Sequence, residues 1–331
     1  MPQENRPALF RMGIDIGGTT VKLGLVDANN QITARAGIPT PEDFGEAANA
    51  IAAAARSLLK GAGLKPSSLP FAGVGVPSTL QQETGRIIFA NNAGWKDAPL
   101  RDAMEQRLDI KVLAANDADC ALSGEAAAGA AAGVKNVLMF TLGTGVGGAM
   151  LLDGRLYRGY KGLGMELGHT PIMAGGRLCT CGTRGCLEAY ASATGLIALT
   201  KEAMAETPGS QMHQHVQQHS GLVDGRTAFD CAKAKDTAAL KVVDAYCELL
   251  AQGIGGQVNV FRPELVLVGG GLSHAGGALL ERVKRMLPRF VLSVDLIPLP
   301  EVRLAQLGND AGIIGAAFLD LVEQGKKDAS S

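Results

Sequence analysis

Three cysteines and one histidine near the middle of the chain have the types and spacing of a metal site. Cys179, Cys181 and Cys186 lie within one short stretch, and His169 precedes them. Thiolate and imidazole ligands in a Cys₃His set bind zinc tetrahedrally, and four protein ligands close the site to catalytic water. The sequence therefore predicts a structural zinc loop. The alternative is a set of free thiols, or one disulfide, on a loop.

Two glutamates flank this predicted zinc loop. Glu166 stands one helical turn or one hairpin step from His169, and Glu188 follows Cys186 by two positions. A zinc ion that binds one ring nitrogen of His169 leaves the other nitrogen free for a hydrogen bond to a ligand. The zinc would then hold His169, Glu166 and Glu188 around a polyol. Taken singly, each glutamate also fits a solvated helix acid.

Two glycine-rich turns could bind phosphate. Glycine lets several backbone N–H groups approach one anion, and threonine and lysine add further donors. A carboxylate at the end of the strand before the first turn could hold Mg²⁺ through water. Either turn alone also fits an ordinary tight hairpin. The first turn offers Asp15, Gly17, Gly18, Thr19, Thr20 and Lys22, and the second offers Gly143, Thr144 and Gly145.

A third glycine cluster contains Gly270 and Gly271, between an apolar run and a predicted helix. Backbone without side chains there could lie flat against a base or ribose, although a plain strand-to-helix turn is the alternative. Two other phosphate motifs are excluded. The chain has no GxxxxGK[ST] motif, and the GxGxxG pattern that starts at Gly143 runs into a strand where a dinucleotide site needs a helix.

Asn116 and Asp117 lie between a short apolar strand and an alanine-rich helix. An aspartate at the carboxyl end of a strand is well placed to face a ligand cleft. There it could orient an attacking sugar hydroxyl and accept its proton during phosphoryl transfer. The alternative role for Asp117 is a helix N-cap.

The elements that would position these residues form a weak internal repeat. Residues 12–27 and 136–153 both read as strand, glycine turn and strand, each opening its own α/β half. We therefore expect a duplicated α/β architecture with a cleft between the halves and a hinge near residues 117–135. The other expected strands are 32–37, 71–76, 112–115 and 265–268, and the expected helices are 40–61 (capped by Thr40), 97–108, from 117 to about 132, 241–260 and 310–323.

Composition excludes several classes of protein. The 331 residues carry a net charge of −1 and only 4% aromatic residues, which disfavours nucleic acid as a partner. No apolar run reaches the length of a membrane span, and the first residues lack the features of a signal peptide. We expect a cytoplasmic protein that does not bind membranes.

The motifs, in their order, resemble the ROK family of the actin-like ATPase superfamily, and most of all its bacterial glucokinase type. They read DIGGTTVKLGLVD, ANNAGW, AANDADC, FTLGTGVGGA, ELGH and CTCGTRGCLEAYAS. The resemblance implies a two-lobed actin-like ATPase (ribonuclease H-like) fold of α/β class, with an interlobe cleft and a structural zinc loop. It implies ATP-dependent phosphorylation of a hexose at O6, with Mg²⁺ bound to ATP. Glucose is the expected hexose.

The resemblance also implies roles for single residues. Asp117 matches the general base, and the glycine turns with Gly270 and Gly271 match the ATP site. His169, Cys179, Cys181 and Cys186 match the zinc ligands. The residues that match sugar ligands are Asn116, Glu166, His169, Glu188 and one of Asn91 and Asn92.

The implied lobes are residues 1–117, joined by a C-terminal helix from about 300–331, and residues 118–299 with the zinc loop. Homodimers or homotetramers are usual in the family. Pro77-Ser78-Thr79 departs from the loop of glucose-type members, so an N-acetylhexosamine (N-acetylglucosamine or N-acetylmannosamine) or another hexose is the alternative substrate. A sugar-sensing transcriptional regulator is the other alternative, but the first hairpin begins by Ile14 and we expect no room before it for a DNA-reading helix.

Overall fold

The computed structural model describes residues 10–90, 93–219 and 221–323 as an α/β protein. One five-stranded sheet has the order β3-β2-β1-β4-β8, a second has the order β11-β10-β9-β12-β13, and a small sheet has the order β5-β6-β7. The chain divides into two compact units. Unit 1 contains residues 1–136, 149–165 and 306–331, and unit 2 contains residues 137–148 and 166–305.

The strands follow the expected positions closely. The glycine turns lie between β1 and β2 and between β9 and β10, so both predicted hairpins are confirmed. The strands are β1 (Arg11–Ile16), β2 (Thr20–Val26), β3 (Ile32–Pro39), β4 (Ala72–Val76), β5 (Thr79–Gln81), β6 (Arg86–Ala90), β7 (Trp95–Ala98), β8 (Val112–Asn116), β9 (Val137–Leu142), β10 (Val146–Leu152), β11 (Arg155–Leu156), β12 (Leu265–Gly269) and β13 (Glu301–Leu304).

The helices belong to both units. They are α1 (Phe44–Gly61), α2 (Leu100–Leu108), α3 (Asp117–Ala128), α4 (Glu188–Ala191), α5 (Ala193–Glu206), α6 (Gln211–His219), α7 (Thr227–Lys233), α8 (Thr237–Phe261), α9 (Gly277–Met286), α10 (Ala311–Ala317) and α11 (Leu319–Glu323). Short 3₁₀ turns at Pro66–Ser68, Tyr160–Gly162, Leu167–His169, Gly271–Ala275, Leu287–Phe290 and Gly308–Asp310 complete the order.

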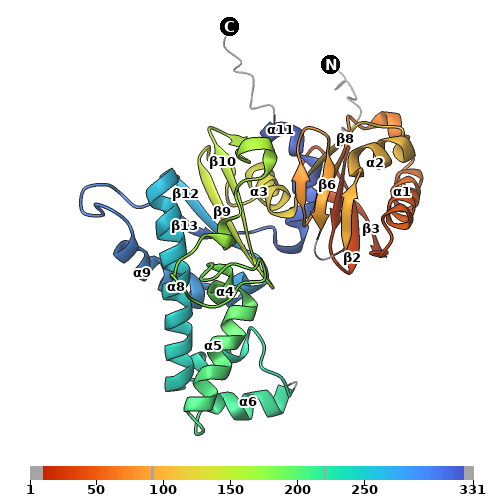
Figure 1. The fold of residues 1–331 in the computed structure, drawn as a ribbon. Coiled ribbons are helices and arrows are strands. Elements are labelled where there is room, and N and C mark those ends of the chain that lie inside the picture. The colour runs from red at the N-terminus through yellow and green to blue at the C-terminus, as the bar shows by residue number, and fades with distance from the viewer. Residues whose placement is uncertain (1–9, 91–92, 220, 324–331) are drawn as a thin grey trace, which may run out of the picture. The chain divides into compact units, whose positions relative to one another are not determined.

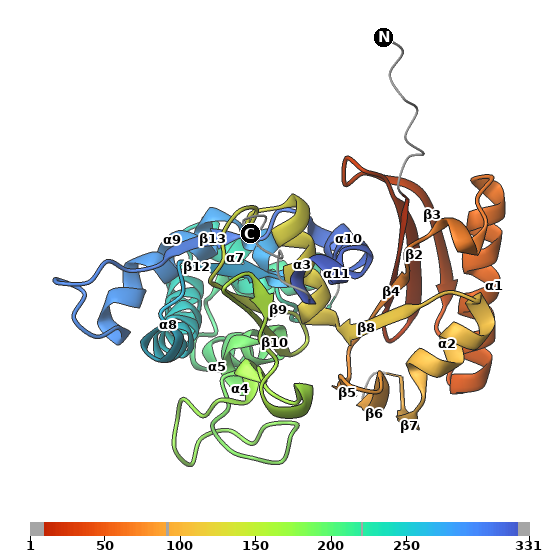
Figure 2. The same cartoon turned by 90° about the horizontal axis from the view of Figure 1, so that it is seen from above.

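In unit 1, helices cover both faces of the first sheet (Figures 1 and 2). Helices α1 and α2 contact one face, and α3 and α10 contact the other. Strand β1 is antiparallel to β2 and parallel to β4, and β4 is parallel to β8. Because parallel strands end at one edge, the chain segments that follow β1, β4 and β8 come together there.

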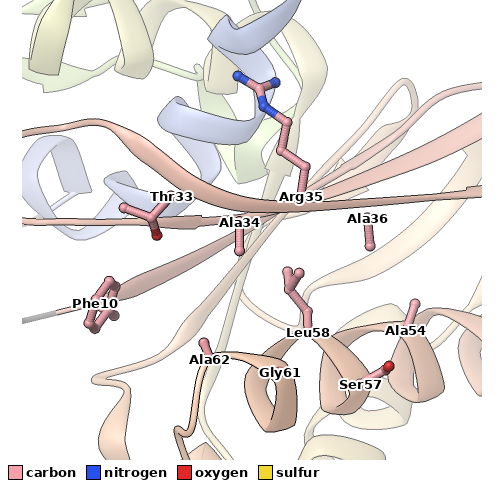
Figure 3. Close-up of a pocket in the computed structure, with 10 residues that line it drawn as sticks. All are labelled: Phe10, Thr33, Ala34, Arg35, Ala36, Ala54, Ser57, Leu58, Gly61 and Ala62. Atoms are coloured by element: carbon pink, nitrogen blue, oxygen red, sulfur yellow. The ribbon is translucent and has the colours of Figure 1, made fainter.

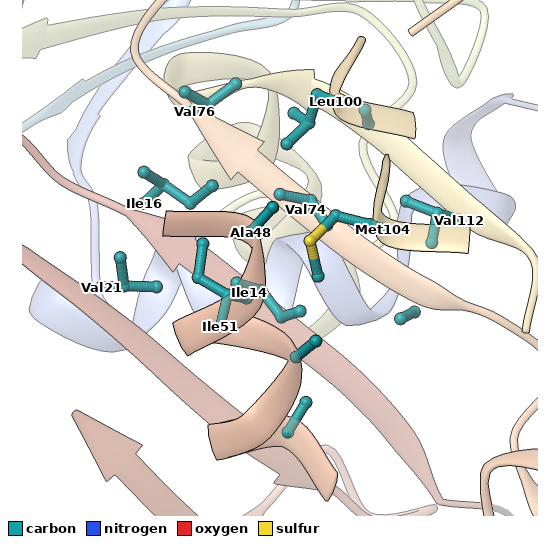
Figure 4. Close-up of a cluster of buried hydrophobic side chains, with 14 of the residues drawn as sticks. Ile14, Ile16, Val21, Ala48, Ile51, Val74, Val76, Leu100, Met104 and Val112 are labelled. Carbon is teal, nitrogen blue, oxygen red and sulfur yellow. The ribbon is translucent and has the colours of Figure 1, made fainter. Parts of the chain in front are cut away.

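The larger core of unit 1 fills the space between the sheet and helices α1 and α2 (Figure 4). Alternate residues of β1 and β4 point into it, as the two-residue period of a strand requires. Ile14 and Val74 from the sheet meet Ile51 from α1 and Met104 from α2, and all four are at most 1% exposed. Burial of each such side chain contributes about 1.5–3 kcal/mol.

Helix α10 reaches the opposite face of this sheet because glycine stands at the contact points. A Cβ atom on Gly13 would lie 1.9 Å from the carbonyl oxygen of Ile313. On Gly73 it would lie 1.7 Å from the carbonyl oxygen of Ala316. Neither distance is possible for real atoms, so only glycine lets α10 pack this close to β1 and β4.

In unit 2, side chains of the long helix α8 form hydrogen bonds to the chain segments next to the predicted metal loop. Its side chains hold two backbone stretches next to His169: Gln257 Nε2 donates to Thr170 Oγ1 at 3.2 Å, and Gln252 Nε2 donates to the carbonyl of Ile172 at 3.0 Å. A Cβ atom on Gly253 would lie 2.5 Å from Leu187 Cδ1, so glycine there makes room for the residue that follows Cys186.

Several predicted helix boundaries are wrong. Thr40 does not cap α1. The cap is Asp43, whose carboxylate accepts from Glu46 N at 2.8 Å, because the Thr40 hydroxyl is used elsewhere. The helix predicted from Asp97 begins at Leu100, and Asp97 belongs to β7.

Two further predicted helices are shorter than expected. Helix α3 ends at Ala128 because Glu125 accepts the N–H of Ala130 at 2.7 Å and turns the chain away from the helix. The expected final helix is two helices, α10 and α11, interrupted at Phe318, where the N–H bonds three residues back to Gly315 O. The predicted lobes, residues 1–117 with about 300–331 and residues 118–299, stay a prediction, and the two compact units have different bounds.

Candidate active site

In unit 1, Asp117 lies at the edge where the parallel strands end. Strand register pairs Asp15 with Gly75 and Gly75 with Ala115, so β1, β4 and β8 finish side by side. Asp117 is the first residue of α3, directly after β8. This is the edge at which open α/β sheets bind their ligands.

The N-cap of α3 is Asn116, not Asp117. Asn116 Oδ1 accepts from Ala118 N at 2.8 Å, and its amide Nδ2 donates to the carbonyl of Ser78 at 3.1 Å. The alternative role of Asp117 as the helix cap is therefore filled by its neighbour. Asp117 itself is an exposed residue in the first turn of the helix.

The surroundings of Asp117 favour a protonated carboxyl group. The protein packed around Asp117 disfavours the charged form and raises the pKa of its carboxyl group to about 6, while the residue itself is exposed at the surface. The backbone N–H of Ala118 opposes the rise in the pKa, and the negative charge of Asp15 adds to it. Burial likewise raises the pKa of Asp15, against the effect of Lys22.

The first glycine turn is held by Thr40. Its hydroxyl donates to the carbonyl of Gly17 at 2.7 Å, and its N–H donates to the carbonyl of Thr19 at 3.1 Å. Gly18, Thr19 and Thr20 remain exposed on the outer side of the turn. Lys22 lies opposite Asp15 in the β1–β2 register. The predicted hairpin is thus present, and phosphate binding by its turn stays a prediction.

In unit 2, the second glycine turn is in backbone contact with the third glycine cluster. Gly269 pairs with Thr141 between the parallel strands β12 and β9. A Cβ atom on Gly270, whose φ is +82°, would lie 2.5 Å from the carbonyl oxygen of Leu142, the residue before Gly143. The two predicted nucleotide loops of this unit are therefore adjacent at the ends of β9 and β12.

Two backbone N–H groups of the second turn already donate hydrogen bonds within the protein. Gly143 N donates to the carbonyl of Gly145 at 3.0 Å, and Val146 N donates to Glu188 Oε2 at 3.0 Å. A Cβ atom on Gly145 would lie 2.3 Å from the same Glu188 oxygen. Glycine at this position thus allows the carboxylate to enter the turn.

The four predicted metal ligands form one cluster. The donor atoms of His169, Cys179, Cys181 and Cys186 all lie within 4.8 Å of one another. Sγ of Cys181 is 3.7 Å from Sγ of Cys186, and Nδ1 of His169 is 3.7 Å from Sγ of Cys179. A tetrahedral zinc site has S–S edges of about 3.8 Å and S–N edges of about 3.6 Å. The residues therefore fit zinc, and Nε2 of His169 is the ring nitrogen left for a ligand.

The flanking glutamates differ in their contacts. The exposed Glu166 precedes the 3₁₀ turn that carries His169, and the two are joined by a backbone bond of 3.0 Å from His169 N to Glu166 O. Glu188 starts α4 and contacts both the second glycine turn and the metal loop, where Thr180 Oγ1 donates to Oε1 at 2.9 Å. Asn91 and Asn92 lie outside the described residues.

Sequence reasoning missed the polar residues that hold these groups in place. Thr40, Thr180 and Thr194 each bond to a turn or to a site carboxylate, and Ser78 accepts from Asn116 through its carbonyl. A single threonine has no pattern that marks a long-range hydrogen bond. The one hint of such a contact in the sequence is Thr180, which lies between two predicted metal ligands in the run Cys179-Thr180-Cys181.

Unit 1 also contains a pocket of about 630 Å³ between β3 and α1 (Figure 3). Apolar side chains such as Ala34, Ala36 and Leu58 line it, and the Arg35 side chain extends from the other side of the strand. The predicted site residues are not among the ten that line this pocket.

Of the helices in the described residues, none combines the length and the apolar character that a bilayer crossing requires.

The chain is thus an α/β protein with two hairpin turns rich in glycine and a Cys₃His loop. The model of the ROK family matches residues 11–323. The chain therefore belongs to the ROK family, and the predicted family is confirmed.

Relatives and solved structures are similar to this chain over almost its whole length. A glucokinase of Halalkalibacterium halodurans is 39% identical over 311 residues, which cover 93% of this chain and 94% of that protein. An N-acetyl-D-glucosamine kinase of Escherichia coli is 31% identical, with 94% and 99% covered. A ROK family glucokinase from Streptomyces griseus, solved with glucose and AMPPNP, has a TM-score of 0.80 at 31% identity, with 96% and 100% covered. The predicted fold class is confirmed.

Proposed function

We propose that this protein is an ATP-dependent hexose kinase that phosphorylates glucose at O6. Glucokinases are 33–39% identical over most of the chain, and a ROK family glucokinase with bound glucose and AMPPNP has the same fold. The observation that carries the mechanism is the position of Asp117. It stands at the carboxyl edge of parallel strands, and its neighbour Asn116 supplies the helix cap.

In the proposed reaction, the O6 oxygen of the sugar attacks the γ-phosphorus of ATP. The O6–P bond forms as the bond from the γ-phosphorus to the β-phosphate oxygen breaks, and ADP leaves with the electron pair. Asp117 orients the O6 hydroxyl and accepts its proton. A pKa of about 6 suits this role, because the carboxylate is ionised at neutral pH and still basic enough to take a proton.

The remaining predicted residues divide between the sugar and the nucleotide. Asn116, Glu166, His169, Glu188 and one of Asn91 and Asn92 are proposed to bind sugar hydroxyls. The ATP phosphates are assigned to the two glycine turns (Gly17, Gly18, Thr19, Thr20 and Lys22; Gly143, Thr144 and Gly145), and the adenosine to Gly270 and Gly271. Asp15 is proposed to hold Mg²⁺ through water, and the ion would offset the negative charge of the phosphates.

Zinc is proposed to have a structural role. The cluster of His169, Cys179, Cys181 and Cys186 has the spacing for a closed tetrahedral site. His169 would hold the metal through Nδ1, which would fix the plane of its imidazole, and its Nε2–H could then donate to a sugar hydroxyl. The expected setting is the cytoplasm, and the expected assembly is a homodimer or homotetramer, as the family resemblance implies.

An N-acetylhexosamine is the second candidate substrate. N-acetyl-D-glucosamine kinases are among the relatives, and Pro77-Ser78-Thr79 departs from the glucose-type loop. This loop follows β4 and contacts Asn116 through the Ser78 carbonyl, which supports a place for it near the sugar.

A coupled assay of ADP release tests the function and the choice of sugar. The panel contains glucose, N-acetylglucosamine, N-acetylmannosamine, mannose, fructose and allose, with ATP or polyphosphate as donor. We expect the highest kcat/KM for glucose with ATP. Asp117→Asn should lower kcat by about 10²–10⁴-fold while glucose still binds. Turnover close to wild type in that variant would rule out Asp117 as the base.

A further inference from the structure

Glu188 uses both carboxylate oxygens to join two parts of unit 2. Oε2 accepts the backbone N–H of Val146, in the second glycine turn, at 3.0 Å. Oε1 accepts the hydroxyl of Thr180, in the metal loop, at 2.9 Å. The carboxylate fits between them because Gly145 has no Cβ atom, which would lie 2.3 Å from Oε2. The metal loop and the nucleotide turn are therefore linked through one side chain.

Thr180 donates to Glu188 from within the metal loop and is not itself one of the four predicted metal ligands. It stands between two predicted ligands, Cys179 and Cys181. The sulfur of Cys179 also lies 3.5 Å from Glu188 Oε1. The Thr180 hydroxyl, at 2.9 Å, makes the shorter of these two contacts with Oε1. We therefore take Thr180 as the donor that keeps Oε1 in place.

The same stretch of chain holds the turn at two more points. Ala193 N donates to the carbonyl of Gly143 at 2.8 Å, and Thr194 Oγ1 donates to the carbonyl of Thr144 at 3.0 Å. Residues 180–194 thus contact the second glycine turn at Gly143, Thr144 and Val146. The amides that remain for phosphate are oriented by these contacts, since each fixes a neighbouring peptide plane.

We propose that Thr180 is a positioning residue that couples the metal loop to the nucleotide turn through Glu188. An ordered metal loop then raises the affinity of the second glycine turn for the phosphates of a nucleoside triphosphate. The inference rests on the proposed function, in which this turn binds ATP and Glu188 binds the hexose. Because coupling between two ligands is reciprocal, hexose and nucleotide should strengthen each other's binding by the same factor.

Thr180→Val tests the proposal, because it keeps the shape of the side chain and removes the hydroxyl. Thr207→Val, at the exposed C-cap residue of α5, is the matched control. Both variants are compared with wild type in metal content, in the Kd of Mg²⁺-AMPPNP with and without glucose, and in hydrogen exchange of residues 143–148. None of these readouts needs turnover.

We expect Thr180→Val to retain one metal per chain and to bind AMPPNP roughly 3- to 10-fold more weakly, as the net contribution of one exposed hydrogen bond implies. Exchange in residues 143–148 should be faster, and the mutual strengthening by glucose should shrink. The control should match wild type in all three. An unchanged AMPPNP Kd and unchanged exchange with the metal retained would overturn the inference.

Two further outcomes are separated by the same measurements. If Thr180→Val loses its metal, chelated wild-type protein takes its place, and an AMPPNP affinity equal to that of the metal-bound protein would contradict the coupling. Failure of wild type to bind AMPPNP at all would refute the proposed function. In that second case, the exchange rates of residues 143–148 in a metal-bound Thr180→Val still decide whether Thr180 positions the turn.

Discussion

The side-chain amide of Asn116 donates to the carbonyl of Ser78 at 3.1 Å, while its oxygen caps helix α3. One side chain thus ties the loop after β4 to the end of β8. Because Asn116 directly precedes Asp117, the position of the proposed base depends on a residue that is not itself the base.

Substitutions at Asn116 should separate these two bonds. Asn116→Ala removes both, and we expect the free energy of unfolding to fall by about 1–2 kcal/mol. Asn116→Ser keeps a capping oxygen but is too short to reach Ser78, so it should lose less stability and still raise the KM for hexose. Urea denaturation and steady-state kinetics check both effects. An alanine variant as stable as wild type would show that the cap contributes nothing.

Ionisation of Asp117 should lower the free energy of unfolding. Its pKa is about 6 in the folded protein and 3.8 in an ordinary setting, so folding favours the protonated form. Its contribution to stability is therefore greatest below pH 3.8 and is lost as the pH rises through about 6. The full difference in pKa corresponds to about 3 kcal/mol. Since solvent reaches the carboxylate, screening should leave about 1 kcal/mol.

Asp117→Asn should therefore be more stable than wild type at pH 7–8, and the gain should shrink as the pH falls from 6 toward 4. Urea denaturation across this range measures it. Asp295→Asn removes the same charge from an exposed loop and controls for net charge. A stability gain for Asp117→Asn that grew toward low pH would have the wrong sign and would reject the raised pKa.

Local patterns in the sequence predicted much of the fold. Both hairpins followed from apolar runs on either side of glycine turns, because such turns are set by neighbouring residues. The Cys₃His cluster was predictable for the same reason, since three of its four ligands lie in one short loop. The resemblance to the ROK family then supplied the fold class, which no single motif fixes.

Contacts between distant residues could not be predicted in this way. Thr40 looks like a helix cap by its sequence, but its hydroxyl bonds to Gly17 across the sheet edge, and Asp43 caps the helix instead. Glu188 looks like a helix acid beside a cysteine. Its bond to Val146 spans 42 residues of sequence and requires a glycine at 145. These partners become visible only when the strands and loops are assembled.

Removal of the metal should loosen the sugar-binding residues. Metal analysis should find one zinc per chain, and chelation should weaken glucose binding at least about tenfold, because ligand affinity depends on residues that the metal orients. Calorimetric titration with glucose measures this. Cys181→Ser should weaken metal retention, whereas Cys231→Ala, at a buried thiol outside the cluster, should not. Full glucose affinity in a verified metal-free sample would refute the link between metal and sugar.

Gly145→Ala tests the contact between Glu188 and the second glycine turn from the other side. The new Cβ atom would lie 2.3 Å from Glu188 Oε2, so the carboxylate must move and its bond to Val146 N is lost. We expect kcat/KM to fall about 10–100-fold for both hexose and ATP, since a displacement of about 1 Å is enough for such a loss. Steady-state kinetics with each substrate varied in turn measures the effect.

Gly256→Ala is the matched control for this substitution. Gly256 lies within α8, a Cβ atom there has no atom of another described segment within 4 Å, and alanine favours the helix. This variant should keep wild-type kinetics and melt at the same temperature or slightly higher. If Gly145→Ala also kept wild-type kinetics, the carboxylate of Glu188 could move without loss of activity. Binding of nucleotide and of sugar would then not depend on its present position.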